Sequence, residues 1–146
     1  MSQSRTIQPS GVPVGDENSG PTGSFRGSET CNVSGYIWSQ IALLRVGGRS
    51  ICADRAERAL FNAAPAAVSR DFRSHVYMQS PNRIGAHLPE GGQFHYRPVH
   101  SPLCCTASLN RFLPAYGTHM WMATYGNGLA AGHYGPWLRL RRPWRA

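Results

Sequence analysis

The feature that most constrains this chain is a segment, residues 31–46, that is apolar on nearly every side at the period of an α-helix. Its large side chains recur at steps of three and four residues, the spacing of one helical face. Trp38 and Leu43 fall off that face. A helix that is apolar all round is buried on more than one side, so the sequence predicts one slice of a larger helical domain. The face consists of Val33, Tyr36, Ile37, Gln40, Ile41 and Leu44.

Local signals place the ends of this helix and of two others. Ser28 or Thr30 can cap the first helix, and the pair Gly47–Gly48 ends it. A second helix is predicted over residues 53–64, closed by a proline. A third begins just after Cys105 and is kinked by another proline. The capping residue of the second helix is Ser50, and the two prolines are Pro65 and Pro114.

Three short runs read as strands: residues 75–79, 93–97 and, with weak alternation, 128–134. The predicted fold class is therefore mainly α with short β-strands. Residues 1–28 differ from the rest because they are rich in Gly, Ser, Pro and Thr, and we expect an irregular loop segment there. A loop this long within a compact domain is usually functional or disordered.

The positive charge does not indicate a nucleic-acid-binding protein. The net charge is +8 and all 15 basic residues are Arg, but outside the tail they are scattered and often stand next to an acid. A nucleic-acid-binding protein concentrates its basic residues on one face of its surface. Only the Arg-rich tail, residues 137–146, has such a concentration of basic residues. We expect this tail to be disordered. The four arginines of the tail are Arg139, Arg141, Arg142 and Arg145.

Membrane insertion and export are not expected either. No apolar run in the 146 residues approaches the roughly 20 needed to span a bilayer. The first residues lack the apolar core of a signal peptide. We therefore expect a cytoplasmic protein whose cysteines stay reduced.

The cysteines carry the chemical signal. Cys104 and Cys105 are adjacent and precede a predicted helix, whose N-terminal dipole favours thiolate over thiol. Glu29 and Cys31 stand two residues apart at the start of the first helix, where both side chains can turn toward one point. Thiolates and a carboxylate are ligands of Zn²⁺. The alternative is that these cysteines, like Cys52, are small buried hydrophobic residues.

Two glutamates and two histidines are further candidates. Glu17 lies in the Gly/Pro-rich loop, where a carboxyl group can serve as a general acid, although most loop glutamates belong to the plain surface. Glu57 on the second helix fits a solvated or salt-bridged residue. His95 and His100 stand near the cysteine pair and can contact a ligand, or else play a structural role.

Three blocks in this order resemble the beta-L-arabinofuranosidases of glycoside hydrolase family 127. They are Glu29-Thr30-Cys31, the stretch of residues 56–62 that reads AERALFN, and Cys104-Cys105. The similarity runs from about Pro13 to about Pro136. It implies a catalytic (α/α)6 barrel, of which residues 29–136 would form a part. Family members are several hundred residues long, so the resemblance also implies that barrel segments outside this chain are needed and that the chain alone is inactive.

The resemblance assigns roles to individual residues. It implies a zinc ion held by Glu29, Cys31, Cys104 and Cys105, with Cys104 as nucleophile. It implies that Glu17 is the general acid/base and that Glu57 supports the site. The expected reaction is the retaining hydrolysis of an L-arabinofuranoside-like carbohydrate. Two other classes stay open: a non-catalytic zinc-binding module, and a basic nucleic-acid binder that acts through the tail.

Overall fold

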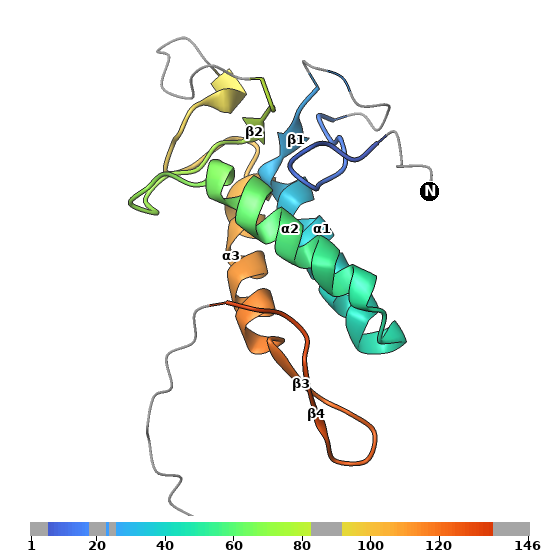
Figure 1. Cartoon of the computed structure of the whole chain (residues 1–146). Helices are drawn as coiled ribbons and strands as arrows, with labels where there is room; N and C mark the ends of the chain where they lie inside the picture. The colour runs from blue at the N-terminus through green and yellow to red at the C-terminus, as the bar shows by residue number, and fades with distance from the viewer. Residues whose placement is uncertain (1–5, 18–22, 24–25, 83–91, 136–146) are drawn as a thin grey trace, which may run out of the picture.

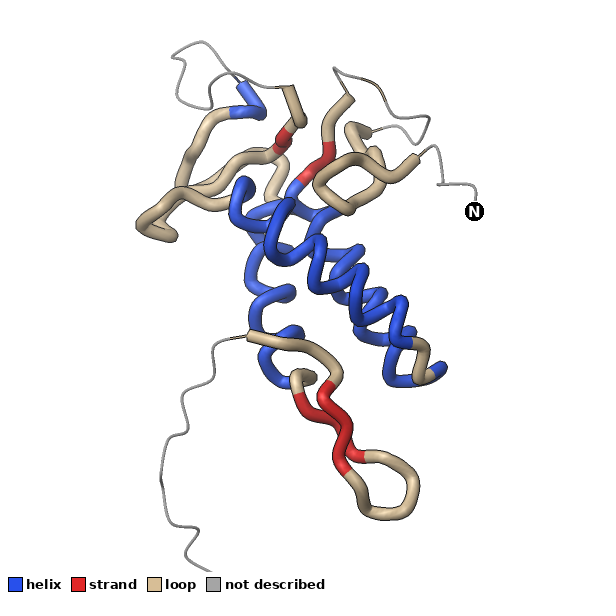
Figure 2. Tube along the Cα trace, viewed as in Figure 1, coloured by secondary structure: helices blue, strands red, loops and turns tan. Residues whose placement is uncertain are grey.

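The computed structural model describes residues 6–17, 23, 26–82 and 92–135 of the chain. Helices are the main regular elements of this part and the strands are short (Figures 1 and 2), which confirms the predicted mainly helical class. The Arg-rich tail, residues 137–146, lies outside the described residues. The elements in chain order are β1 (Ser28–Glu29), α1 (Thr30–Gly47), α2 (Ser50–Ala67), β2 (Met78–Gln79), a 3-10 turn (Gly92–Phe94), α3 (Cys104–Thr118), β3 (Trp121–Ala123) and β4 (Leu129–Ala131).

Helix α1 buries one face and exposes the other. Val33, Ile37 and Ile41 are at most 2% exposed and belong to the main core cluster. Trp38 and Leu43 are 56% and 54% exposed. The expectation that α1 is buried on more than one side is therefore wrong within the described residues. The reason is that α2 and α3, the two helices packed on α1, contact the core face.

The two ends of α1 form differently. The N-cap is Glu29, which has an extended backbone and makes no capping hydrogen bond through its side chain. Neither Ser28 nor Thr30 caps the helix, because each hydroxyl donates instead to the carbonyl of a residue distant in sequence. At the other end Gly48 adopts the left-handed conformation (φ 62°), and its N–H donates to the Leu44 carbonyl. The predicted glycine stop is therefore confirmed.

Helix α2 lies along α1 (Figure 1) and is longer than predicted. It continues past Pro65 to Ala67, so the prediction that this proline closes the helix is wrong. Proline lacks an N–H and its ring crowds the carbonyl four residues earlier, but Pro65 is only two residues from the end of α2, so the disturbance is confined to the last turn. Ala56, Ala59 and Ala63 are fully buried, and their small side chains let the two helices approach closely.

Helix α3 begins at Cys104, two residues before the predicted start, and contains Pro114. Near its beginning the Ser34 hydroxyl of α1 donates to the Ser108 carbonyl at 2.7 Å. Further along, Phe112 and Tyr116 enter the core. These contacts align the N-terminal ends of α1 and α3, which is the feature that positions the site below.

The strands β1 and β2 support the same end of the helices, whereas β3 and β4 lie beyond the C-terminal end of α3 (Figure 1). β1 pairs antiparallel with β2, with Glu29 opposite Met78. The predicted strand at residues 93–97 is wrong as a regular strand, because its first residues form the 3-10 turn. It still lies beside residues 75–79, since the backbones of His75 and Arg97 exchange two hydrogen bonds of 2.9 Å. The run at 128–134 contains β4, which pairs with β3 in a hairpin.

The described helices are compatible with part of a helical barrel. An apolar cavity of about 340 Å³ opens between the second half of α2 and the second half of α3. Its rim includes Phe61 and Leu113, each about half exposed. None of the described helices is both long and apolar enough to cross a lipid bilayer.

Candidate metal centre

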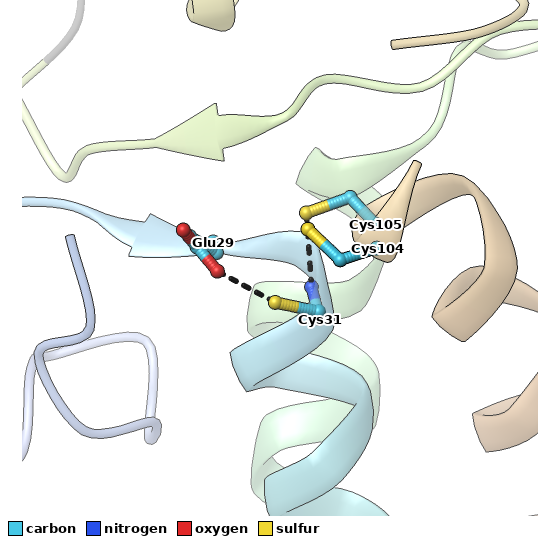
Figure 3. Close-up of side chains that lie close together, drawn as sticks. All are labelled: Glu29, Cys31, Cys104 and Cys105. Carbon is cyan, nitrogen blue, oxygen red and sulfur yellow. Dashed lines mark hydrogen bonds between the residues drawn. The ribbon is translucent and has the colours of Figure 1, made fainter. Parts of the chain in front are cut away.

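The first half of the site is the junction between β1 and α1. The extended backbone of Glu29 leads into the helix at Thr30, so the side chains of Glu29 and Cys31 emerge close together. The Cys31 thiol donates a hydrogen bond to Glu29 Oε2 at 2.6 Å (Figure 3). Pairing of β1 with β2 fixes the backbone from which both side chains project.

The second half is the first turn of α3, which carries the adjacent cysteines. Cys105 is fully buried and Cys104 is exposed. The Cys31 backbone N–H donates to Cys105 Sγ at 3.4 Å, and the Cys105 thiol donates to the Tyr77 carbonyl at 3.5 Å. The start of α3 is thereby attached both to α1 and to the segment that contains β2.

Together these elements gather four donor atoms. One ligand atom each from Glu29, Cys31, Cys104 and Cys105 lies within 4.8 Å of all the others (Figure 3). In a tetrahedral site with Zn–S bonds of about 2.3 Å, sulfurs are about 3.8 Å apart, so small side-chain rotations suffice. The Glu29 carboxylate also has a buried oxygen, Oε1, without a hydrogen-bond partner in the described structure. The cluster is therefore able to hold a metal ion.

The electrostatics of the cluster couple cation binding to proton release. Burial is the main cause that raises the pKa of Cys31 far above its usual value, and the hydrogen bond to the Glu29 carboxyl is the second. Burial raises the pKa of Cys105 to about 11. Burial and then the neighbouring Glu17 carboxyl also raise the pKa of Glu29. A divalent cation reverses these shifts because its charge favours the anionic ligands.

Glu17 lies at the edge of the cluster, connected to it by Tyr77. The Tyr77 hydroxyl donates to Glu17 Oε1 at 2.6 Å and lies 3.7 Å from Cys104 Sγ. Two hydrogen bonds lower the pKa of Glu17. The larger effect comes from the Glu29 carboxyl and the smaller from the Tyr77 hydroxyl. The Glu17 carboxylate in turn raises the pKa of Tyr77, so the hydroxyl keeps the proton that it donates.

Tyr77 is the residue of this site that the sequence did not reveal. It is 2% exposed and contributes both its hydroxyl and its carbonyl to the cluster. In the sequence it belongs to a short strand-like run, and a tyrosine in a strand ordinarily indicates packing. No spacing signal links it to the cysteines, which are more than twenty residues away.

Glu57 and the histidines are not among the four gathered donors. Glu57 stands in the middle of α2, where its charge helps to raise the pKa of Tyr116. Tyr116 follows Cys104 by three helical turns, about 18 Å along α3, and Glu57 is not among the gathered donors. His100 has a structural contact, because its Nε2 lies 2.8 Å from the His75 carbonyl. His75 Nε2 lies 3.0 Å from the Thr106 hydroxyl in the first turn of α3.

Comparison with known protein families gives a match that spans the residues of this site. The family model described as the Beta-L-arabinofuranosidase, GH127 catalytic domain, matches residues 14–118. This range includes Glu17 and all four gathered donors, and ends before the C-terminal limit that the sequence resemblance suggested. It covers most of the chain, so the chain belongs to this family of glycoside hydrolase domains. No curated protein and no solved structure matches the chain.

Proposed function

We propose that this chain binds zinc through Glu29, Cys31, Cys104 and Cys105 and carries the catalytic groups of a retaining glycoside hydrolase. The substrate class proposed is a carbohydrate that resembles a β-L-arabinofuranoside. The observation that carries the proposal is the convergence of four donor atoms within 4.8 Å, in a chain of the GH127 family. Glu57, which is not one of the four donors, is proposed to support the site through hydrogen bonds to substrate or to ligand residues.

The donor set suits zinc better than other common metals. Three thiolates select soft or borderline ions, whereas calcium and magnesium take oxygen ligands. Structural and catalytic zinc sites both use Cys with carboxylate or imidazole ligands in tetrahedral geometry. When bound, zinc keeps the cysteine sulfurs deprotonated at neutral pH.

Cys104 is the proposed nucleophile because it is the exposed cysteine of the cluster. Its sulfur forms a bond to the anomeric carbon of the sugar while the bond from that carbon to the leaving oxygen breaks. Glu17, which Tyr77 holds near this sulfur, must carry a proton at this stage. The Glu29 carboxyl, whose contact lowers the pKa of Glu17 in the metal-free chain, would give up its own proton on becoming a metal ligand. Glu17 would accept that proton and donate it to the leaving oxygen. The sugar is then attached to Cys104 and Glu17 is a carboxylate.

Glu17 acts as the base in the second step. It accepts a proton from a water molecule whose oxygen attacks the anomeric carbon. The carbon–sulfur bond breaks and Cys104 leaves as a thiolate. Two displacements at one carbon give net retention, with sulfur in the place that a second carboxylate takes in most retaining glycosidases.

A non-catalytic zinc module is the second candidate, and one observation favours it. All four ligand positions are filled by protein donors, which is typical of closed structural zinc sites. The exposure of Cys104 and the neighbouring Glu17 favour catalysis instead. Such a module would bind zinc but would react with no sugar.

Covalent labelling tests the proposal without requiring turnover, which we expect to need barrel segments outside this chain. We expect an epoxide analogue of β-L-arabinofuranose to form a single adduct on Cys104 of the zinc-loaded chain, detected by peptide mass spectrometry. Glu17→Gln should slow labelling by about a hundredfold or more, because the epoxide oxygen needs a proton. The Cys104→Ala variant should form no adduct.

The control is Cys52→Ala, which removes a buried cysteine of α2 outside the cluster and should label like the parent chain. Labelling spread over several cysteines, or as fast in Glu17→Gln as in the parent, would exclude the catalytic roles. A zinc-loaded chain that takes no label at all would favour the structural module.

A further inference from the structure

Glu17 has a backbone conformation that residues with a side chain rarely adopt. Its φ is 70°, in the left-handed region, where a Cβ approaches the following carbonyl. Such strain persists only where the surroundings enforce it. The contacts of the loop around Glu17 therefore indicate what holds its carboxyl group in place.

The residue before Glu17 is fixed by an ion pair with two hydrogen bonds. Arg26 donates from Nε to Asp16 Oδ2 at 2.7 Å and from a terminal nitrogen to Oδ1 at 2.6 Å. The Gly27 N–H donates to the same carboxylate at 3.4 Å. Although burial acts in the opposite direction, these bonds hold the pKa of Asp16 below its usual value. Two parallel bonds fix the orientation of the carboxylate as well as its position.

The backbone on both sides of this ion pair is paired as well. Gly15 donates to the Gly27 carbonyl at 3.1 Å and accepts from the Glu29 N–H at 2.9 Å. Gly15 and Ser28 thus form a parallel bridge, and the loop lies beside β1 (Figure 1). The segments that lead to Glu17 and to Glu29 are therefore held side by side.

A separate set of hydrogen bonds fixes the backbone at Arg26. Gln8, which is 3% exposed, donates from its side chain to the Arg26 carbonyl at 2.9 Å. The Ser28 hydroxyl, whose single proton is shared with the Pro13 carbonyl at 2.7 Å, also lies 3.1 Å from the oxygen of the same amide. Arg26 is therefore attached to β1 through a buried polar network and does not depend on its own side chain for placement.

We propose that Asp16 and Arg26 are positioning residues that hold Glu17 against Tyr77, and hence beside Cys104. This inference rests on the proposed function, in which Glu17 is the acid/base. The ion pair fixes the chain on one side of the left-handed residue, and the hydroxyl of Tyr77 fixes the carboxylate on the other. Without the ion pair, Glu17 can relax to an ordinary backbone conformation and withdraw its charge from the cluster.

The test uses Cys104 as a sensor of the Glu17 charge and needs neither zinc nor turnover. In the reduced, metal-free chain, the rates at which Cys104 reacts with neutral iodoacetamide and anionic iodoacetate are measured by peptide mass spectrometry. A carboxylate beside the sulfur slows the anionic reagent by about threefold relative to the neutral one. We expect Glu17→Gln to lower that preference, although the Glu29 carboxyl close to the same sulfur keeps part of it, and Asp16→Asn to lower it equally.

A double-mutant cycle separates positioning from a direct effect of the lost charge. If Asp16 acts through Glu17, adding Asp16→Asn to Glu17→Gln leaves the rate ratio unchanged. Asp71→Asn is the matched control, because Asp71 also orders a turn through its carboxylate and should keep the parent ratio. Arg26→Lys keeps the charge but loses the two parallel hydrogen bonds, and it should lower the reagent preference as much as Asp16→Asn. It replaces Asp16→Asn in the test if that variant folds poorly.

The inference fails if Asp16→Asn and Arg26→Lys keep the parent ratio, or if Asp16→Asn shifts the ratio as much in the Glu17→Gln background. This failure is distinct from failure of the proposed function. If the cycle behaves as expected but the sugar epoxide does not label Cys104, the positioning of Glu17 stands and its role as acid/base falls.

Discussion

Replacing Cys105 by alanine is expected to weaken zinc binding by at least about a hundredfold, because changes just outside a metal's ligands already cost 10–100-fold. Cys105 is fully buried, and its sulfur both accepts from the Cys31 N–H and donates to the Tyr77 carbonyl. The substitution therefore removes a ligand and also loosens the two segments that carry the others. Competition with a chromogenic zinc chelator measures the effect.

Cys52→Ala is the matched control for this measurement. Cys52 is also buried, in α2, but does not belong to the cluster. We expect this variant to bind one zinc ion with the affinity of the parent chain. Equal losses of zinc affinity in the two variants would mean that the affinity depends on the general stability of the chain and not on the proposed ligands.

Replacing Ile37 by alanine is expected to lower the free energy of unfolding by about 2–5 kcal/mol. Ile37 is fully buried in the cluster where α1 meets α2 and α3, so the missing methyl groups leave a cavity. Chemical denaturation followed by circular dichroism measures the change.

The neighbouring Trp38→Ala variant is the control for Ile37. Trp38 is 56% exposed, and we expect its removal to change the free energy of unfolding by less than about 1 kcal/mol. A larger loss at Trp38 than at Ile37 would place the core on the opposite face of α1 from the one described.

The helices were predictable because their apolar side chains repeat at the helical period. The same pattern overstated the burial of α1, since it cannot tell a packed face from an exposed apolar one, as Trp38 shows. The cap of α1 was mispredicted because the hydroxyls of Ser28 and Thr30 find partners far away in the sequence. Pro65 lies close enough to the end of α2 to be tolerated within it.

The candidate site was predictable in its cysteines and not in its geometry. Helix starts after Glu29 and at Cys104 follow from local pattern, but their meeting depends on how α1 packs against α3. Tyr77 reaches the site only through the pairing of β1 with β2, which no local signal fixes. Glu57 was chosen from its sequence block alone, and its supporting role stays a prediction.

X-ray absorption spectroscopy at the zinc edge tests the central claim most directly. For the chain loaded with one equivalent of zinc, the account predicts three sulfur ligands at about 2.3 Å and one oxygen ligand at about 2.0 Å. Cys31→Ser should lower the number of sulfur ligands from three to two. Glu29→Gln should change the contribution of the oxygen ligand. A first shell of nitrogen and oxygen alone, or a chain that retains no zinc, would contradict the account.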